Sequence, residues 1–166
     1  MEGVSIRTAQ LRDHQEVQAV RQRSSLSNEG DRDFILANPD TLTYDPTPLG
    51  QGRTRVAIDD GRIVGFVTVA GDDELELEAL FVEPSSMRKG VGRALVRDVI
   101  EGARAKGITR ITVTANAHAL QFYNAAGFVE DGPFATRAGT ATRMHLDLGR
   151  GARSSGRTLD RRSRAP

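Results

Sequence analysis

Residues 75–95 read LELEALFVEPSSMRKGVGRAL, and this stretch decides the fold. An apolar strand with acidic residues leads through a proline-marked turn into a glycine pair and a helix-forming run. Because Gly90 and Gly92 lack side chains, backbone N–H groups there can approach an anion, toward which the following helix points its positive dipole end. Three basic side chains surround the glycines: Arg88, Lys89 and Arg93. The stretch therefore predicts a binding site for a diphosphate.

The apolar pattern on either side of this stretch predicts alternating strands and helices. Strand-like runs occupy residues 4–6, 53–58, 63–70, 74–82 and 108–115, with two more from residue 128 and around 144–148. Helical runs occupy residues 11–20 and 24–37, the segment from the glycine pair to Gly107, and the segment from Asn116 to Gly127. Antiparallel hairpins followed by a strand–helix–strand crossover predict a mixed α+β sheet rather than a uniformly parallel one.

Turn and cap residues mark the boundaries of these elements. Asp59-Asp60-Gly61 is typical of a tight antiparallel hairpin, and Asp131-Gly132-Pro133 is expected to turn the chain between the last two strands. Asn38-Pro39 stops the second helix, and the Pro- and Thr-rich segment up to Gly52 is expected to be the least regular part of the chain. Asn116 stands at the expected N-cap of the last helix.

The chain has 166 residues, of which 38% are hydrophobic, and this suffices for one domain with a substantial core. We expect that domain to span residues 1–148. No run approaches the roughly 18 apolar residues that a membrane span needs, and the first ten residues lack a secretory pattern, so we expect a cytoplasmic protein with no membrane partner. The absence of cysteine excludes disulfides, thiolate metal sites and a cysteine nucleophile.

Residues 149–166 form an arginine-rich tail with a net charge of +5, which leaves the rest of the chain with a net charge of −4. Glycine and serine are interspersed with the arginines, and apolar residues are nearly absent, so we expect a disordered end. A basic tail also suits nucleic acid or an acidic surface, although nucleic acid is the less favoured partner here.

Two motifs resemble the Gcn5-related N-acetyltransferase (GNAT) superfamily, whose members transfer an acyl group from acyl-coenzyme A to an amine. The first is its phosphate loop, Gln/Arg-x-x-Gly-x-Gly/Ala, which is similar to residues 87–92, MRKGVG. Met87 departs from the pattern, but this loop holds the diphosphate largely through backbone N–H groups, so the mechanism is kept. The second, Asn-x-x-Ala-x-x-x-Tyr followed by Gly-Phe, resembles residues 116–128. The resemblance covers about residues 3–148.

The resemblance implies an acyl-CoA N-acyltransferase fold, with a central, mostly antiparallel sheet of about seven strands flanked by about four helices. It implies acetyl-CoA as co-substrate, a small-molecule or peptide amine as acceptor and, as is common in the family, a homodimer. The residues that it implies for cofactor binding are Leu80, Phe81, Val82, Arg88, Lys89, Gly90, Val91, Gly92, Arg93, Asn116 and Tyr123. A splayed strand around residues 80–82 would offer a backbone N–H to the thioester oxygen, and a bulge there would supply it.

Acyl transfer needs a base for the amine, and strand 74–82 offers a row of glutamates that share one face if the strand is regular. In the histone-acetylating branch, the basic glutamate lies four residues before the strand position that contacts the cofactor; taking Leu80 as that position selects Glu76. Another branch has a glutamate five residues before the motif asparagine, where this chain has Ile111. Glu78, a base that acts through water, and a merely solvated strand face are the alternatives.

Tyr123 is the candidate acid for the departing thiolate. A phenol with an ordinary pKa of about 10 can donate to a thiolate whose conjugate acid has a pKa of about 8.5. The alternative is a core aromatic, since Leu120 and Phe122 are its neighbours. Asn116 either caps its helix alone or also bonds the pantetheine arm.

Other chemistries lack their motifs. The three histidines, His14, His118 and His145, lack metal-ligand spacing, and no metal is expected. His118 is expected to be exposed or to support other residues rather than to act as a base. The sequence has no nucleoside-triphosphate loop, dinucleotide fingerprint or serine nucleophile elbow, so direct attack in a ternary complex is expected.

The expected function is therefore acetyl transfer from acetyl-CoA to a primary amine. The alternative is a non-catalytic module that senses acyl-CoA and binds a partner or nucleic acid through the basic tail. Residues 24–52 and the final hairpin are expected to line the acceptor site. Four carboxylates of this region could attract a cationic amine: Asp31, Asp33, Asp40 and Asp45.

Overall fold

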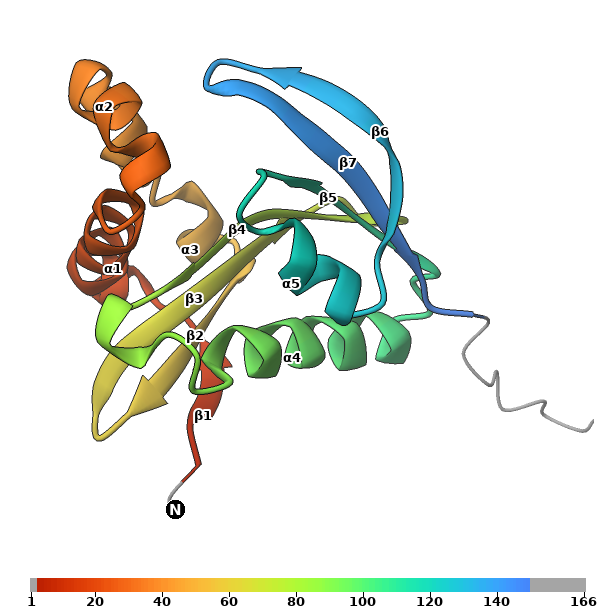
Figure 1. Ribbon diagram of the computed structural model, residues 1–166. Coiled ribbons are helices and arrows are strands. Elements are labelled where there is room, and N and C mark those ends of the chain that lie inside the picture. Colours follow the sequence, from red (N-terminus) through yellow and green to blue (C-terminus); the bar gives the residue numbers. More distant parts are fainter. Residues whose placement is uncertain (1–2, 150–166) are drawn as a thin grey trace, which may run out of the picture.

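The computed structural model describes residues 3–149, which form a seven-stranded sheet (Figure 1). The strands are β1 (Ser5–Thr8), β2 (Thr54–Asp59), β3 (Arg62–Ala70), β4 (Leu75–Val82), β5 (Arg110–Ala115), β6 (Val129–Thr136) and β7 (Gly139–Asp147). They lie in the order β1-β2-β3-β4-β5-β7-β6, and all neighbours are antiparallel except β4 and β5. The mixed, mostly antiparallel α+β sheet is confirmed. The predicted tail, apart from residue 149, lies outside the described residues.

Helices cover both faces of this sheet (Figure 1). They are α1 (His14–Leu26), α2 (Glu29–Ala37), α3 (Thr47–Gly50), α4 (Val91–Ala105) and α5 (Leu120–Ala125), with 3₁₀ turns η1 (Leu11–Asp13), η2 (Pro39–Leu42) and η3 (Pro84–Ser86). α4 and α5 pack on one face, whereas α1 and α3 pack on the other and α2 lies against α1. Among residues 3–149, no helix combines the length and apolar character that crossing a bilayer requires.

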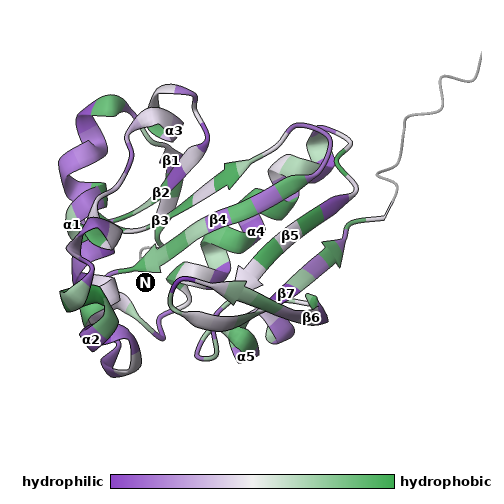
Figure 2. Cartoon of the chain, turned by 90° about the horizontal axis from the view of Figure 1, so that it is seen from above, coloured by the Kyte–Doolittle hydropathy of each residue, from purple (hydrophilic) through white to green (hydrophobic). Residues whose placement is uncertain are grey.

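The core consists of two clusters of buried side chains, one on each face of the sheet. On the α4 face, Leu95 and Met144 are fully buried. On the other face, Val17 and Val20 of α1 pack with Phe66 of β3. The predicted apolar face of α4 is buried as expected: Val91, Leu95, Val99 and Ala103. Figure 2 shows the same arrangement, with apolar residues along the central strands and a largely polar outer surface on α1.

β4 contains a bulge at Glu78. Thr68 of β3 pairs with Ala79, whereas the next residue, Val69, pairs with Leu77, so Glu78 is the extra residue. Before the bulge, odd-numbered residues of β4 face the α4 cluster, and after it even-numbered residues do. The glutamates of this strand therefore do not share one regular face.

The bulge also opens the sheet. β4 and β5 pair in parallel as far as Leu77 and Val113, and beyond this point the two strands diverge (Figure 1). The expected splay is thus present, although its bulge lies at Glu78 rather than within residues 80–82. The divergence creates the space in which the candidate site lies.

One predicted turn is wrong. Asp131-Gly132-Pro133 lies within β6, and the chain turns only after Thr136. A bulge next to Glu130 accommodates the glycine, and proline is tolerated because β6 is the edge strand of the sheet and that edge has no partner strand within the described residues.

The helix predicted for residues 24–37 is divided in two. α1 continues to Leu26, and α2 begins at Glu29 after a break in which the Ser27 hydroxyl donates to the Ser24 carbonyl at 2.7 Å. Asn38-Pro39 ends α2 as predicted. Ser27 in the break and Ser24 and Ser25 in the last turn of α1 line the same cavity beside the sheet.

Candidate active site

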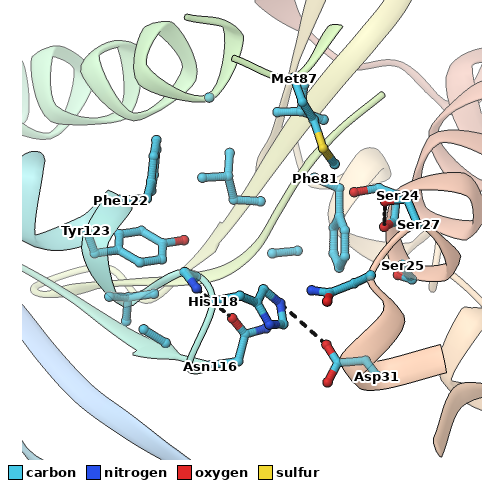
Figure 3. Close-up of a pocket in the computed structure, with 18 of the residues that line it drawn as sticks. Ser24, Ser25, Ser27, Asp31, Phe81, Met87, Asn116, His118, Phe122 and Tyr123 are labelled. Carbon is cyan, nitrogen blue, oxygen red and sulfur yellow. Dashed lines mark hydrogen bonds and ion pairs between the residues drawn. The ribbon is translucent and has the colours of Figure 1, made fainter. Parts of the chain in front are cut away.

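A cleft of about 1120 Å³ lies where β4 and β5 diverge (Figure 3). We call the part lined by residues 86–93 its loop end and the part lined by residues 21–41 of α1, α2 and η2 its helix-pair end. Residues 77–82 of β4 and residues 113–126 of β5 and α5 line the region between the two ends. One cavity therefore brings together the two motifs that the sequence pointed to.

The loop end presents the start of α4. Gly90 is the N-cap of this helix and has a left-handed backbone with φ of 83°, and Arg88 is left-handed as well, with φ of 63°. Within the described residues no side chain caps the first-turn N–H groups of α4, which lack acceptors inside the helix. Nothing lies within 4 Å of the point where a β-carbon of residue 90 would stand. This end can therefore receive an anion, and it meets the requirements of a diphosphate cradle.

The other predicted loop residues have different surroundings. Arg88 and Arg93 line the cleft, whereas Lys89 does not. A β-carbon at Gly92 would lie 3.4 Å from the ring of Phe122. This is an ordinary van der Waals distance, so the packing of Phe122 leaves room for a β-carbon at position 92.

The backbone of β4 faces the cleft beyond the bulge. The Glu83 N–H donates to the Val64 carbonyl at 2.8 Å, which makes these two residues a hydrogen-bonded pair of the β3–β4 ladder. Because bonded and non-bonded pairs alternate in an antiparallel ladder, the N–H and C=O groups of Leu80 and Val82 point away from β3. They face the gap that β5 has left, so an extended ligand arm could pair with them.

Tyr123 stands in the middle of the cleft wall. Its ring packs edge-on against Phe122 and Phe128, with centroid distances of 5.1 and 5.3 Å, and the residue is 5% exposed. Its hydroxyl points into the cleft (Figure 3). Burial raises the pKa of Tyr123 above its usual value, so the phenol stays protonated at neutral pH. The ring therefore packs in the core, as one reading of the sequence predicts, and the hydroxyl faces the cleft, where its role as a proton donor stays a prediction.

The segment before α5 is a turn closed by Asn116. Its side-chain Oδ1 and its carbonyl each accept from the Ala119 N–H at 3.1 Å. The prediction that Asn116 is the N-cap of the helix is wrong, because α5 begins only at Leu120 and its N-cap is Ala119; Asn116 caps the preceding turn. His118 Nε2 lies 3.4 Å from Asp31 Oδ2, which links the turn to α2 across the cleft (Figure 3).

The structure separates the two candidate bases. Glu78 lines the cleft together with Tyr123, whereas Glu76 does not. Arg143 Nη1 donates to Glu76 Oε1 at 2.9 Å, and both residues line a smaller pocket that also includes Thr112. The prediction of Glu76 counted residues along a regular strand, and the bulge at Glu78 breaks that regularity.

The helix-pair end carries side chains that the sequence analysis did not single out, notably Arg21, Ser24 and Ser25. Their spacing of three and four residues places them on one face of α1, but a few polar residues on a helix are an unspecific signal. Of the four predicted aspartates, Asp31 lines this end. The others do not: Asp33 is exposed, Asp40 accepts from Arg137 at 3.0 Å, and Asp45 binds the first N–H of α3.

This architecture, a mixed sheet that splits beside an uncapped helix N-terminus, is the GNAT fold of N-acetyltransferases. The family profile described as "Acetyltransferase (GNAT) domain" matches residues 22–148. The chain belongs to the GNAT acetyltransferase family.

Curated relatives match parts of the chain. It is 34% identical over 97 residues to the peptidyl-lysine N-acetyltransferase YiaC of Escherichia coli (strain K12), covering 58% of this chain and 55% of that protein. It is 34% identical over 73 residues to the chloroplastic serotonin N-acetyltransferase 2 of Oryza sativa subsp. japonica, covering 43% of this chain and 36% of that protein. The chain thus spans about half the length of the curated relatives that it matches.

Solved structures share the fold over most of the chain. The PaiA N-acetyltransferase of Thermoplasma acidophilum, in complex with coenzyme A, matches with a TM-score of 0.71 and 16% identity over 87% of this chain and 99% of that one. The ribosomal-protein-S18-alanine N-acetyltransferase of Escherichia coli matches with a TM-score of 0.66 and 21% identity over 88% of this chain and 94% of that one. At these identities the likeness concerns the fold alone.

Proposed function

We propose that this protein transfers the acetyl group of acetyl-CoA to a primary amine by direct attack in a ternary complex. One observation carries the proposal: a single cleft joins an uncapped helix N-terminus, a free strand backbone and a buried tyrosine whose hydroxyl points inward. These are the three kinds of group needed to hold a diphosphate, extend a pantetheine arm and protonate a thiolate.

The proposed positions of the co-substrate follow from these groups. The diphosphate binds at the loop end, on the N–H groups that start α4 and beside Arg88 and Arg93. The pantetheine arm pairs with the backbone of Leu80 and Val82, and Asn116 can add a bond because its capping role uses only its oxygen atoms. The acceptor amine then enters from the helix-pair end. Residues 1–148 form the catalytic domain in this proposal.

When bound, acetyl-CoA supplies a thioester whose carbonyl carbon accepts the amine nitrogen and whose carbon–sulfur bond breaks. The chain has three tasks in this reaction. A free N–H at Leu80 or Val82 stabilises the negative charge that develops on the carbonyl oxygen. Tyr123 donates its phenolic proton to the leaving sulfur, and Glu78 takes a proton from the amine, directly or through water. No covalent intermediate on the protein is needed.

The assignment of the base follows from placement. Glu78 lies on the cleft at the point where β4 leaves β5, whereas the carboxylate of Glu76 is held by Arg143 outside the cleft. We therefore propose Glu78 and not Glu76. His118 also lines the cleft, but it is linked to Asp31 near the helix-pair end, so we assign it to the acceptor side.

Thiol release tests the proposed function. The protein is incubated with acetyl-CoA and a panel of primary amines, and both free thiol and acetylated amine are measured. Amine-dependent thiol release in wild type, together with tight acetyl-CoA binding by calorimetry, is expected. Tight binding with no thiol release for any amine would instead favour a non-catalytic acyl-CoA sensor, and absence of binding would remove both functions.

A further inference from the structure

Arg21 occupies an unusual position at the helix-pair end. Its Nε and Nη2 groups donate to the Thr41 carbonyl at 3.2 and 3.0 Å, and its guanidinium carbon lies 5.2 Å from the ring centroid of Phe81. Ser24 and Ser25 line the cleft on the same face of α1. The guanidinium is thus held in place by a carbonyl and a ring, while its Nη1 group takes no part in these contacts.

Two other arginines whose guanidinium groups are held in place, Arg23 and Arg55, are neutralised by carboxylates. Arg23, two residues further along α1, is bound to Glu83 at 2.6 and 3.0 Å, and this carboxylate raises the pKa of Arg23. Arg55 is held in the same way by Asp98. No ion pair of Arg21 occurs among residues 3–149, and burial lowers its pKa.

A partly buried cation without a counter-ion is costly, and a carbonyl and an aromatic ring offset only part of that cost. The planar guanidinium is suited to binding two oxygen atoms of a carboxylate or phosphate side by side. Because Arg21 faces the cleft, a ligand there can supply the missing negative charge. Ser24 and Ser25 line the same cavity from the next turn of the helix, so their hydroxyl groups can add hydrogen bonds to a ligand there.

We propose, on the basis of the acetyl transfer proposed above, that Arg21 is a specificity-determining residue that binds a carboxylate or phosphate group on the amine acceptor. The acceptor is then a small zwitterion. Its ammonium group faces Glu78 in the middle of the cleft, and its anionic group faces Arg21 at the helix-pair end, where Glu29 and Asp31 also line the cavity. The opposite charges of Glu78 and Arg21 fix which end of the acceptor reaches the thioester.

Matched acceptor pairs test this assignment. Each pair differs only in the anionic group: an ω-amino acid and the alkylamine of the same length, an α-amino acid and its carboxamide, and an aminoalkyl phosphate and the amino alcohol. In wild type, kcat/KM is expected to be higher for the anionic member of at least one pair. The pair that shows this preference identifies the group bound by Arg21 as a carboxylate or a phosphate. Arg21→Met, which keeps a long side chain against Phe81, is expected to lower that value by about 10- to 100-fold.

Two further variants set the controls. Arg21→Lys keeps the charge without the planar fork and is expected to lie between wild type and Arg21→Met. Arg32→Met removes an exposed arginine of α2 that does not line the cleft, and it is expected to leave the ratio of the two kcat/KM values unchanged. If Arg21→Met lowers kcat/KM equally for both members of every pair, Arg21 only stabilises the contact between α1 and Thr41, and the assignment is overturned. A wild-type preference for the neutral members would overturn it as well.

The assignment and the proposed function fail in different ways. If no amine releases thiol, the enzymatic function fails, and calorimetry of the same pairs on the CoA-saturated protein decides about Arg21. Tighter binding of an anionic member that is lost in Arg21→Met supports the anion site. Equal or absent binding of anionic and neutral members overturns it.

Discussion

The loop end and the helix-pair end of the cleft are built in different ways. The loop end comes from one short stretch, residues 86–93, and it offers backbone N–H groups at a helix start. The helix-pair end combines side chains from α1, α2 and η2 with a turn far along the chain, as the contact between Asp31 and His118 shows. A backbone-built site suits a ligand portion common to a whole family, whereas a site built from side chains can change its acceptor through single substitutions. Four sets of variants test whether the two ends work as separate binding units on either side of the proposed reaction centre.

The largest effect is expected at the centre, from Tyr123→Phe. This change removes the proposed proton donor but keeps the ring between Phe122 and Phe128. We expect kcat to fall by about 10²- to 10⁴-fold, with acetyl-CoA affinity unchanged in calorimetry. Because burial raises the pKa of Tyr123, wild-type kcat should show no loss from its deprotonation up to about pH 10. Full activity in the variant would show that the leaving thiolate obtains its proton elsewhere.

The next effect is expected from Glu78→Gln, which keeps the shape of the side chain and removes the proposed base. Turnover at neutral pH should fall by about 100-fold, because a general base contributes at least this much. Glu76→Gln is the matched control on the same strand, and it should change kcat little since Glu76 lies outside the cleft. A larger loss in Glu76→Gln than in Glu78→Gln would reverse the assignment.

A change confined to the loop end should affect acetyl-CoA and not the acceptor. Gly90→Asp places a negative charge beside the proposed diphosphate site, and the Kd for acetyl-CoA is expected to rise by about tenfold or more. Gly61→Asp is the control, since Gly61 has a similar left-handed backbone with φ of 72° and an equally open β-carbon position in the β2–β3 turn. Equal effects of both substitutions on binding would attribute the loss to backbone strain.

The smallest effect is expected at the helix-pair end, from Asp31→Asn or His118→Ala. The two side chains are partly exposed and 3.4 Å apart, and such pairs contribute little free energy. We expect the acceptor KM to rise by about two- to fivefold with acetyl-CoA affinity unchanged. The double variant should resemble the single ones, because each removes the same contact. A change in acetyl-CoA affinity would show that the two ends are not separate.

The sequence analysis located the loop end and the centre more accurately than the helix-pair end. Gly90 and Tyr123 belong to motifs, and both line the cleft. The bulge at Glu78 was not visible in the sequence, because one extra residue in a strand leaves the alternation of apolar residues nearly intact. This is why Glu76 was selected on spacing, although its side chain reaches Arg143 instead of the cleft.

The sequence by itself determined the order of elements, the mixed sheet and the start of α4 after Gly90. These depend on local patterns, namely apolar periodicity and the backbone freedom of glycine. Only the tertiary structure decided which side chains share the cleft. Arg21 and Glu78 lie 57 positions apart in the chain, and they line one cavity because α1 packs against the sheet beside the end of β4 and Glu78 lies at the bulge of that strand. Which distant residues line the same cavity depends on how their segments pack, and no local sequence pattern encodes this.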